Sequence, residues 1–372
     1  MPKINKKILL VGGGTGGHVA PLIAIIEELI KFGIPSNQIF LVTDKESSRM
    51  DFVQGHQIEI DTIISGKFNR FFTLSNILTP FKVILGFFQS FRLLKKIKPD
   101  VIFAKGAYLS APLVYAAAKL KIPIYLHESD SIMGATNERL VKYAKKIFVS
   151  YPINYYNRDL GTKLIFSGLP IRKIFFTPPP RSFHLVGGNP QVGSFNLKSI
   201  FIWGGSQGAE KINLMISEKL KDYLKNFELY HICGEKNFEK YDALKRDLPQ
   251  KLRNKYHLYG IVGREISKII SQADLVVSRA GSSLFELAAL AKAVIIIPYP
   301  AAASDHQTFN AEYFSKKNAA VISFEHEINS QGLKNLIFEL MADEGRRREL
   351  EKNIYRLAPQ GAAKKIVEVL LK

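Results

Sequence analysis

The chain twice contains an apolar strand that runs into a glycine-rich loop and then directly into a helix. The first loop, "VGGGTGGHVAP" (11–21), follows the apolar run "KKILL" and precedes "LIAIIEELIKFG". The second, "GGSQGAEKIN" (204–213), follows "SIFIW". Glycine lets the backbone turn tightly and approach a ligand, and the N-terminus of the following helix favours an anion. This arrangement is typical of parallel α/β sheets, whose ligands bind beyond the carboxyl ends of the strands.

The same alternation of strand and helix extends over both halves of the chain. Short runs of β-branched and aromatic residues alternate with helix-length segments, as expected of parallel strands covered by helices. We predict an α/β protein with two Rossmann-like domains, whose parallel sheets face a central cleft. The expected segments are an N-terminal domain (1–176), a linker or insert rich in Pro, Gly and Ser (177–198), a C-terminal domain (199–345) and closing helices (346–372).

A strong excess of positive charge indicates an anionic partner. Lys and Arg number 52 against 33 Asp and Glu, a net charge of +19, which suits nucleic acid, an anionic lipid surface or a phosphorylated substrate. No zinc-finger, RNA-recognition or recognition-helix pattern is present, so nucleic acid is not the expected partner. The single cysteine, Cys233, excludes a disulfide framework and a Cys-based zinc site, and no clustered Asp and His set suggests another metal. The first apolar run is only a strand long, so no signal peptide is expected.

The first loop by itself has three interpretations. Gly12, Gly14 and Gly17 have the spacing of a dinucleotide fingerprint, and Asp44 ends the next strand, where an acid would bind a ribose. A phosphate cradle of another kind, with the titratable side chain of His18 directed at a cleft, is the second interpretation. A tight turn that only requires glycine is the third.

The second loop also has more than one interpretation. Gly204, Ser206 and Gly208 have the spacing of a hydrolase nucleophile elbow, and Asp305 and His326 follow in the order of a catalytic triad. Because the loop opens a second Rossmann-like domain instead of belonging to one continuous hydrolase sheet, we favour a diphosphate cradle.

Polar residues farther along the chain suit a nucleotide sugar. Glu286 lies in the first turns of a helix, where a carboxylate can bind both hydroxyls of a ribose or simply complement the helix dipole. The segment "DHQTFNA" (305–311) places a polar cluster just after the strand "IIIPYP", where it suits sugar hydroxyls or a capped helix start.

Six motifs occur in one order along the chain: "GGGTGGHVAP", "HES", "GLPIR", "GGSQGAEKIN", "SRAGSSLFELAALAKAVIIIPYP" and "DHQTFNA". Together they resemble the MurG family of glycosyltransferases, over about residues 7–320. The resemblance implies a GT-B fold and an inverting transfer of N-acetylglucosamine without metal or other cofactor. The implied donor is UDP-N-acetylglucosamine, bound on the C-terminal domain. The implied acceptor is undecaprenyl-diphospho-N-acetylmuramoyl-pentapeptide (lipid I), bound on the N-terminal domain and converted to lipid II in peptidoglycan biosynthesis.

The resemblance also implies a role for individual positions. The first loop would face the acceptor diphosphate and the donor sugar, Glu286 would bind the ribose, Ile261 would pack near the uracil, and Gln307 would contact the N-acetylglucosamine hydroxyls. The full set of implied substrate-binding residues is Thr15, Gly16, Gly17, Asn137, Arg172, Ser206, Gln207, Ile261, Gly281, Ser282, Ser283, Leu284, Glu286, Asp305 and Gln307.

Inverting transfer needs a base near the acceptor hydroxyl and stabilisation of the departing UDP. His18 is the first candidate for the base or for a diphosphate contact, and Asp130 is the second. Asp130 is itself a departure, because many members of the family carry Asn there and a carboxylate can accept a proton where an amide cannot. Lys105 and Ala107 also depart from the glycine-rich versions that are common in the family.

A segment rich in aromatic and basic residues, 66–99, predicts contact with a membrane. It falls short of the ~20 uninterrupted apolar residues that a span needs, so we expect a helix lying in an anionic leaflet, at the cytoplasmic face of the cell membrane. Packing in the N-terminal core is the alternative for some of these residues. The expected membrane contacts are Phe71, Phe72, Leu78, Phe81, Lys82, Leu85 and Phe88.

Three other functions stay open from the sequence. Another GT-B enzyme that uses UDP-sugars, such as a lipid or polysaccharide glycosyltransferase or an epimerase, would share most of the motifs. A two-domain dehydrogenase would leave the second glycine loop and Glu286 without a role. A catalytically inactive scaffold for cell-wall synthesis would have no physical need for His18, Ser206, Glu286 and Gln307.

Overall fold

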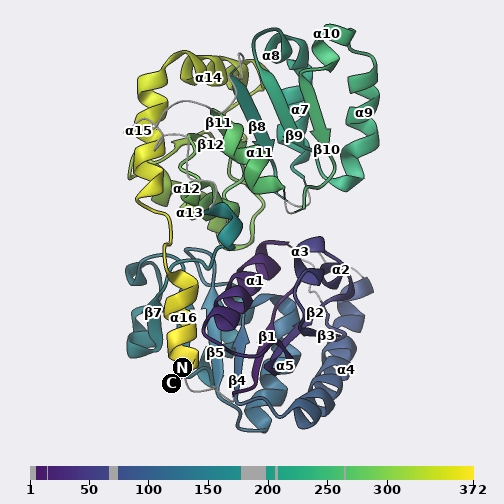
Figure 1. The fold of residues 1–372 in the computed structure, drawn as a ribbon, viewed down its shortest axis with the longest axis vertical. Coiled ribbons are helices and arrows are strands. Elements are labelled where there is room, and N and C mark those ends of the chain that lie inside the picture. The colour runs from purple at the N-terminus through teal and green to yellow at the C-terminus, as the bar shows by residue number, and fades with distance from the viewer. Residues whose placement is uncertain (1–5, 15, 67–73, 177–197, 206–207, 264) are drawn as a thin grey trace. The chain divides into compact units, whose positions relative to one another are not determined.

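The computed structural model describes residues 6–14, 16–66, 74–176, 198–205, 208–263 and 265–372. These residues form two compact units (Figure 1). The first unit comprises residues 1–173 and 359–372, and the second comprises residues 174–358.

The first unit is built on a seven-stranded parallel sheet with the order β3-β2-β1-β4-β5-β6-β7. Its strands are β1 (Ile8–Val11), β2 (Ile39–Thr43), β3 (Glu59–Thr62), β4 (Val101–Ala104), β5 (Ile124–Glu128), β6 (Lys146–Val149) and β7 (Leu164–Phe166). Its α-helices are α1 (Gly16–Lys31), α2 (Lys45–Ser48), α3 (Asp51–Gln54), α4 (Leu74–Ile97), α5 (Ala107–Lys119), α6 (Ala135–Leu140) and α16 (Ala362–Leu370). Short 3₁₀ turns are η1 (Ser36–Gln38), η2 (Val141–Tyr143), η3 (Ile153–Tyr155) and η4 (Arg158–Lys163), and η5 (Lys173–Phe175) lies at the boundary of the two units.

The second unit contains a six-stranded parallel sheet with the order β10-β9-β8-β11-β12-β13. Its strands are β8 (Ser199–Trp203), β9 (Glu228–Ile232), β10 (Tyr256–Tyr259), β11 (Leu275–Ser278), β12 (Val294–Ile296) and β13 (Val321–Ile322). Its α-helices are α7 (Glu210–Glu218), α8 (Leu220–Asn226), α9 (Phe238–Arg246), α10 (Gln250–Arg253), α11 (Ile266–Gln272), α12 (Ser283–Ala289), α13 (His306–Ser315), α14 (Ser330–Ala342) and α15 (Glu344–Tyr355), with 3₁₀ turns η7 (Glu235–Asn237) and η8 (Ala303–Asp305).

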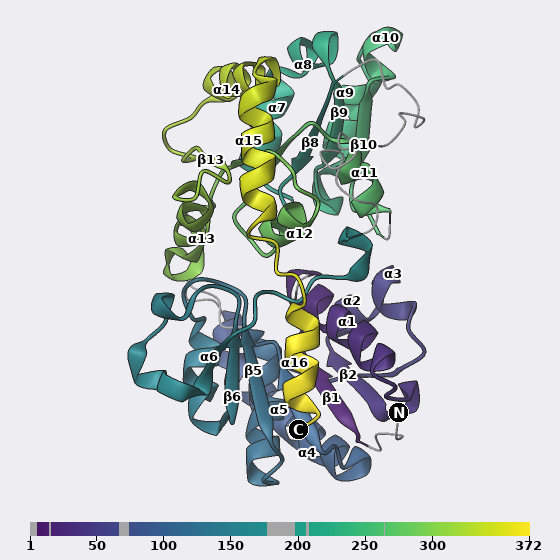
Figure 2. The ribbon, with the colours of Figure 1, turned by 60° about the vertical axis from the view of Figure 1, so that its left-hand side comes forward.

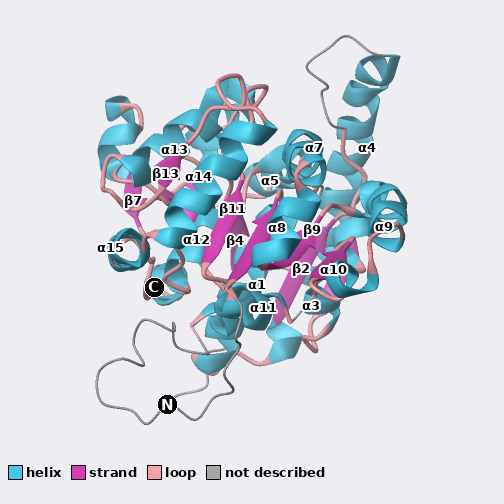
Figure 3. Cartoon of the chain, turned by 90° about the horizontal axis from the view of Figure 1, so that it is seen from above, coloured by secondary structure: helices cyan, strands magenta, loops and turns pink. Residues whose placement is uncertain are grey.

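The apolar character of the strands explains both sheets. The residues of β1, β2, β4 and β5 are all buried, because parallel strands are covered by helices on both faces. Figure 3 shows strands lying between helices. In each sheet the strand order reverses beside the first strand, between β1 and β4 and between β8 and β11, which is where doubly wound sheets bind ligands. The two predicted Rossmann-like domains with parallel sheets are confirmed.

The closing helices do not stay together. The structure divides the predicted closing segment, 346–372. Residues 346–358, which include most of α15, belong to the second unit, and residues 359–372, which include α16, belong to the first. Helix α16 packs against α1, as Figure 2 shows, and places Ile366, Val367 and Leu370 in the core of the first unit. Among the described residues, no helix is both long and apolar enough to cross a membrane.

Candidate active site

The first glycine loop is held by the carboxylate of Asp44. The backbone N–H of Gly14 donates to Asp44 Oδ2 at 2.6 Å, and the hydroxyl of Ser47 donates to the same oxygen at 2.7 Å. The other oxygen, Oδ1, accepts from the backbone N–H groups of Ser47 (2.9 Å) and Glu46 (3.1 Å), and so caps α2. Burial opposes ionisation of this carboxyl, but the hydrogen bonds from Ser47 and Gly14 outweigh it and lower its pKa. Because Asp44 is committed to the loop, it does not offer the free ribose-binding acid of a dinucleotide site.

Glycine is required at the turn of this loop. Gly14 has a φ of +89°, and a Cβ there would lie 2.9 Å from the ring of Tyr108. The expected site residues Gly16, Gly17 and His18 form the start of α1, half-buried at the carboxyl edge of the sheet. Thr15 lies outside the described residues.

A second group of polar residues follows β5, at the same edge of the sheet. The buried carboxylate of Glu128 accepts from the backbone N–H groups of Ser129 (2.8 Å), Asp130 (3.1 Å) and Gly134 (2.9 Å). The side-chain amide of Asn137 donates to it at 2.8 Å and also to the carbonyl of His127 at 3.1 Å. Burial, and then the charge of Asp130, raise the pKa of Glu128. Asn137, an expected substrate contact, is thus buried and bonded to the segment that carries Asp130.

Asp130 itself is half-buried, and its backbone carbonyl accepts from the hydroxyl of Tyr156 at 2.7 Å. Arg172 is buried in the first unit, at the end of the "GLPIR" motif. Two further buried groups in this region, Lys105 and His127, were not expected as site residues. Lys105 was visible in the sequence only as a departure from a glycine-rich pattern.

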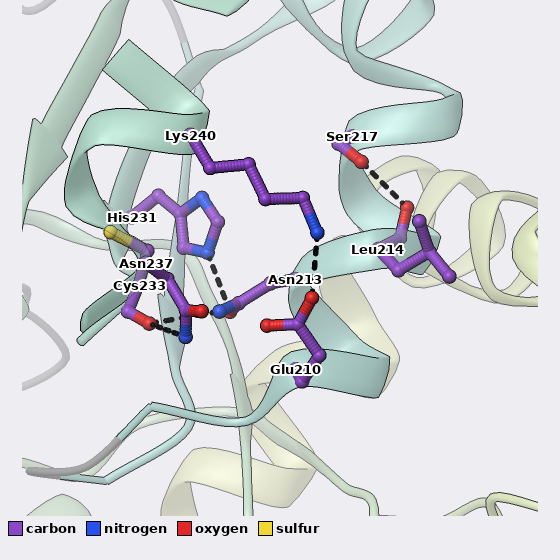
Figure 4. A network of polar contacts seen from close by, with 8 residues as sticks. All are labelled: Glu210, Asn213, Leu214, Ser217, His231, Cys233, Asn237 and Lys240. Carbon is purple, nitrogen blue, oxygen red and sulfur yellow. Dashed lines mark hydrogen bonds and ion pairs between the residues drawn. The ribbon is translucent and has the colours of Figure 1, made fainter. Parts of the chain in front are cut away.

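In the second unit, the second glycine loop is pressed against the end of β9. Gly208 has a φ of +76°, and a Cβ there would lie 2.1 Å from the carbonyl oxygen of Cys233. That same oxygen accepts from the side-chain amides of Asn213 (2.9 Å) and Asn237 (3.0 Å), as drawn in Figure 4. Ser206 and Gln207 lie outside the described residues.

A buried histidine completes this network (Figure 4). His231 Nε2 is hydrogen-bonded to Asn213 Oδ1 at 2.9 Å, and its Nδ1 is hydrogen-bonded to the hydroxyl of Tyr256 at 2.8 Å. Burial lowers the pKa of His231 to about 3, so the ring is neutral. Burial also raises the pKa of the Cys233 thiol to about 11, which makes a thiolate nucleophile unfavourable there.

The hydrolase interpretation gains no support. Asp305 accepts from the hydroxyl of Thr308 at 2.7 Å, whereas the exposed His326 pairs with Glu327 at 3.4 Å. Among the residues that the structure describes, Asp305 and His326 have no hydrogen bond to each other. Over the same described part of the chain, no group of three or more His, Cys, Asp or Glu side chains is placed to hold a metal ion.

Gln307 ties together the turns that follow β11 and β12. Its Oε1 accepts from the backbone N–H groups of Tyr299 (2.9 Å) and Ala280 (3.3 Å). Asn310 donates to the carbonyl of Ala280 at 3.0 Å. With its oxygen engaged, Gln307 has only its amide N–H groups left, so it can donate to a ligand but not accept from one.

Arg279 supports the same two turns and was not expected from the sequence. It is buried and donates through one nitrogen to the carbonyls of Ile297 and Pro298, both at 3.1 Å. Its other terminal nitrogen lies 2.5 Å from a carboxylate oxygen of Glu325. The only sequence signal was an arginine directly after a buried strand.

The remaining expected residues of the second unit surround the start of α12 and the end of β10. Gly281, Ser282, Ser283 and Glu286 are half-buried there, and Ile261 is exposed after β10. Leu284 is fully buried, and its side chain packs in the core.

One face of α4 is both apolar and exposed. Phe81 is 65% and Phe88 57% exposed, and Ile84 and Leu85 lie between them on the same helical face. Exposed basic residues accompany this face: Lys82, Arg92, Lys95 and Lys96. We call these eight residues the α4 surface. Phe71 and Phe72 lie outside the described residues, and the side chain of Leu78 is not among those described.

Comparisons with known proteins agree with this architecture. The chain matches the glycosyltransferase family 28 N-terminal domain over residues 8–149 and the family 28 C-terminal domain over residues 199–367. Two relatives, from Clostridium tetani and Listeria welshimeri, are both named UDP-N-acetylglucosamine--N-acetylmuramyl-(pentapeptide) pyrophosphoryl-undecaprenol N-acetylglucosamine transferase. The first is 33% identical over 88% of each chain. The second is 32% identical over 98% of this chain and 99% of its own.

Solved structures share the fold along nearly the whole chain. Acinetobacter baumannii MurG is similar with a TM-score of 0.70 and 25% identity, over 98% of this chain and 99% of its own. A UDP-GlcNAc 2-epimerase from Neisseria meningitidis, bound to UDP-GlcNAc, has a TM-score of 0.66 at 17% identity, over 98% and 99% of the two chains, which is a likeness of fold alone. The chain therefore has the GT-B fold and belongs to the MurG family of glycosyltransferases, within glycosyltransferase family 28.

Proposed function

We infer that this chain is an inverting N-acetylglucosaminyltransferase. It transfers N-acetylglucosamine from UDP-N-acetylglucosamine to undecaprenyl-diphospho-N-acetylmuramoyl-pentapeptide (lipid I) and makes lipid II in peptidoglycan biosynthesis. The observation that carries this conclusion is the 32–33% identity to transferases of that name over 88–98% of the chain. The presence of both family 28 domains in one chain supports it.

The donor is proposed to bind at the carboxyl edge of the second sheet. Glu286, half-buried in α12, would bind the ribose, and the exposed Ile261 would pack against the uracil. Gln307 would donate from its amide to the hydroxyls of the sugar, because its oxygen is already bonded to Tyr299 and Ala280. The second glycine loop, pressed against Cys233, suits the diphosphate.

The acceptor is proposed to bind at the carboxyl edge of the first sheet. His18 stands at the N-terminus of α1, next to the loop that Asp44 holds, and is the first candidate for the base. Asp130 is the second. The leaving diphosphate would be stabilised by helix N-termini and by Arg172, through charge and hydrogen bonds.

A membrane lipid as acceptor requires the enzyme to reach a membrane surface. The α4 surface supplies exposed aromatic and aliphatic side chains together with basic ones, a combination that suits the interface of an anionic leaflet. We propose that the protein is peripheral and lies at the cytoplasmic face of the cell membrane, with the α4 surface as its contact.

Transfer of radiolabelled sugar from UDP-N-acetylglucosamine to a short-chain lipid I analogue, with EDTA present, tests this function. The wild type should form product. His18→Ala should lower kcat by about 100-fold or more, as expected for loss of a general base. Glu286→Gln should mainly weaken donor binding, by about tenfold, because a ribose hydrogen bond to a charged group is lost.

Three results would contradict the proposal in different ways. Binding of UDP-N-acetylglucosamine without transfer would remove the acceptor assignment and keep the fold. Failure to bind it would remove the donor assignment as well. Near-normal turnover of His18→Ala would make Asp130 the first candidate for the base.

A further inference from the structure

A buried lysine lies beneath the first glycine loop. Lys105 directly follows β4, and its backbone N–H donates to the carbonyl of Val11 at 2.8 Å, at the end of β1. A Cβ on Gly12 would lie 2.9 Å from the Cβ of Lys105, so the start of this side chain runs directly under the loop. Only 2% of Lys105 is exposed.

The ammonium of Lys105 reaches the segment that follows β5. Its Nζ is hydrogen-bonded to the hydroxyl of Ser129. The carboxylates on either side of that serine, Glu128 and Asp130, favour the charged ammonium. Lys105 therefore joins two segments far apart in the sequence, the glycine loop before His18 and the turn that carries Asp130.

Among the residues that the structure describes, two carboxylates act on the charge of Lys105. Glu128 and Asp130 act on it from the end of β5, and Tyr156, whose pKa is raised by burial and by Glu128, stays neutral beside Asp130. Burial and the charge of Lys105 lower the pKa of His127, so that ring also stays neutral. One cation thus faces two carboxylates.

Burying the ammonium of Lys105 costs free energy of folding. Burial lowers the pKa of Lys105 to about 8 although both carboxylates oppose the shift, so the charged form is less favoured in the folded protein than in water. An apolar side chain of similar length would avoid the desolvation of the ammonium, but it would leave Glu128 and Asp130 without an opposing charge. The ammonium is therefore better explained by a role in the turn that carries Ser129 and Asp130 than by packing.

We propose that Lys105 is a positioning residue for the transfer reaction: it holds the Ser129–Asp130 turn against the base of the first glycine loop. This inference rests on the proposed function. A turn with two carboxylates would repel a diphosphate-linked acceptor, and the positive charge of Lys105 offsets that repulsion. Lys105 also fixes the turn through the hydrogen bond to Ser129, and so orients Asp130 on the acceptor side.

The test compares Lys105→Met with Lys105→Arg, and uses Lys119→Met, at an exposed position of α5, as the matched control. Lys105→Met should lower kcat by at least about tenfold, as expected for a misplaced catalytic segment, while the KM for UDP-N-acetylglucosamine stays within about twofold. Its midpoint of thermal unfolding should fall, because Glu128 and Asp130 lose the positive charge that opposes them, so kcat is compared per folded molecule. Lys119→Met should change neither kcat nor thermal stability.

The pH dependence of kcat/KM shows whether the charge of Lys105 or only the shape of its side chain is needed. If the ammonium must be protonated, the kcat/KM of the wild type should fall as the pH rises through about 8. Lys105→Arg keeps its charge at all these pH values, so that decline should be absent from its profile. A decline that persists unchanged in the Arg variant would overturn the proposal.

Activity per folded molecule separates this inference from the proposed function. A Lys105→Met variant with normal kcat, or with a loss of stability and no loss of kcat per folded molecule, would leave Lys105 a structural residue and overturn the inference while the proposed function stands. A wild type that binds UDP-N-acetylglucosamine but transfers no sugar would overturn both.

Discussion

His231 illustrates how one buried side chain can support a glycine loop that it does not contact directly in its hydrogen bonds. Both ring nitrogens are engaged, one with Asn213 and the other with Tyr256, and Asn213 in turn holds the carbonyl that meets Gly208. The network works with a neutral ring, because burial lowers the pKa of His231 to about 3. The hydrogen bonds that hold the end of β9 against the second glycine loop therefore run through a buried, neutral histidine.

Acidification should weaken the second unit through His231. The folded state keeps the ring neutral down to a pKa of about 3, whereas the unfolded chain takes up a proton near its ordinary pKa of 6.5. The free energy of unfolding should therefore fall as the pH falls from about 6.5 to about 3, by up to about 4 kcal/mol from this group. Urea denaturation over that pH range measures it.

The matched comparison is His231→Gln against His326→Gln, a change at an exposed histidine. His231→Gln should reduce the slope of stability against pH, and His326→Gln should leave it as in the wild type. Equal slopes in all three proteins would show that His231 is not the group responsible.

At the scale of elements, the two faces of α4 differ in environment over its described residues. One face packs on α5 and buries Ser90, Leu94 and Ile97, which confirms that part of the aromatic and apolar segment serves the core. The other face leaves Phe81 and Phe88 exposed among basic side chains. A helix of this kind, exposed along its apolar face, suits the plane of a membrane interface.

Replacing Phe81 and Phe88 together by Ser should detach the protein from anionic vesicles. Each phenylalanine that inserts into the membrane interface should contribute about 1.5–3 kcal/mol to the free energy of binding, so the double variant should bind at least about 100-fold more weakly. Vesicle sedimentation with phosphatidylglycerol measures this, and salt should weaken wild-type binding because the basic residues contribute about 1 kcal/mol each. Phe166→Ser, at an exposed phenylalanine of β7, is the matched control.

The same double variant should still transfer sugar to a short-chain, water-soluble acceptor, because α4 is proposed to bind the membrane and not the reacting groups. Unchanged vesicle binding would remove the α4 surface from the membrane model.

At the scale of the whole molecule, the chain returns to its first unit at the very end. Helix α16 follows the entire second unit in sequence, yet Ile366, Val367 and Leu370 are buried in the core built by β1 and α1. Lys365 donates to the carbonyl of Phe166, and Leu370 accepts from Lys6, which adds polar contacts to the same packing. The first unit is thus incomplete without the last residues of the chain.

Ile366→Ala combined with Val367→Ala should destabilise the first unit by about 3–6 kcal/mol, because both side chains leave cavities in a packed core. Hydrogen exchange followed by mass spectrometry should show faster exchange in β1 and α1, with β8 and β11 unchanged. Lys364→Ala, on the exposed face of α16, should leave both units as in the wild type. Uniformly faster exchange in both units would instead indicate one cooperative fold.

Much of this architecture could be predicted from local patterns. Apolar runs such as Ile8–Val11 followed by glycines specify a buried parallel strand and a tight turn, because period and turn chemistry act within a few residues. The position of Asp44 after a strand was also evident from the sequence, but its hydrogen-bond partner was not. Whether a carboxylate binds a ribose or a backbone N–H depends on which groups the fold places beside it.

The sequence by itself determined the two parallel sheets, the glycine loops and the order of motifs that marks the family, because each of these follows from a pattern within a short stretch of residues. Only the tertiary structure decided which polar groups meet: Lys105 with Ser129, Gln307 with Ala280, and His231 with Asn213. It also decided that α16 completes the first core. The physical reason is that burial and hydrogen bonding are satisfied between segments far apart in the chain, where no local pattern records the partner.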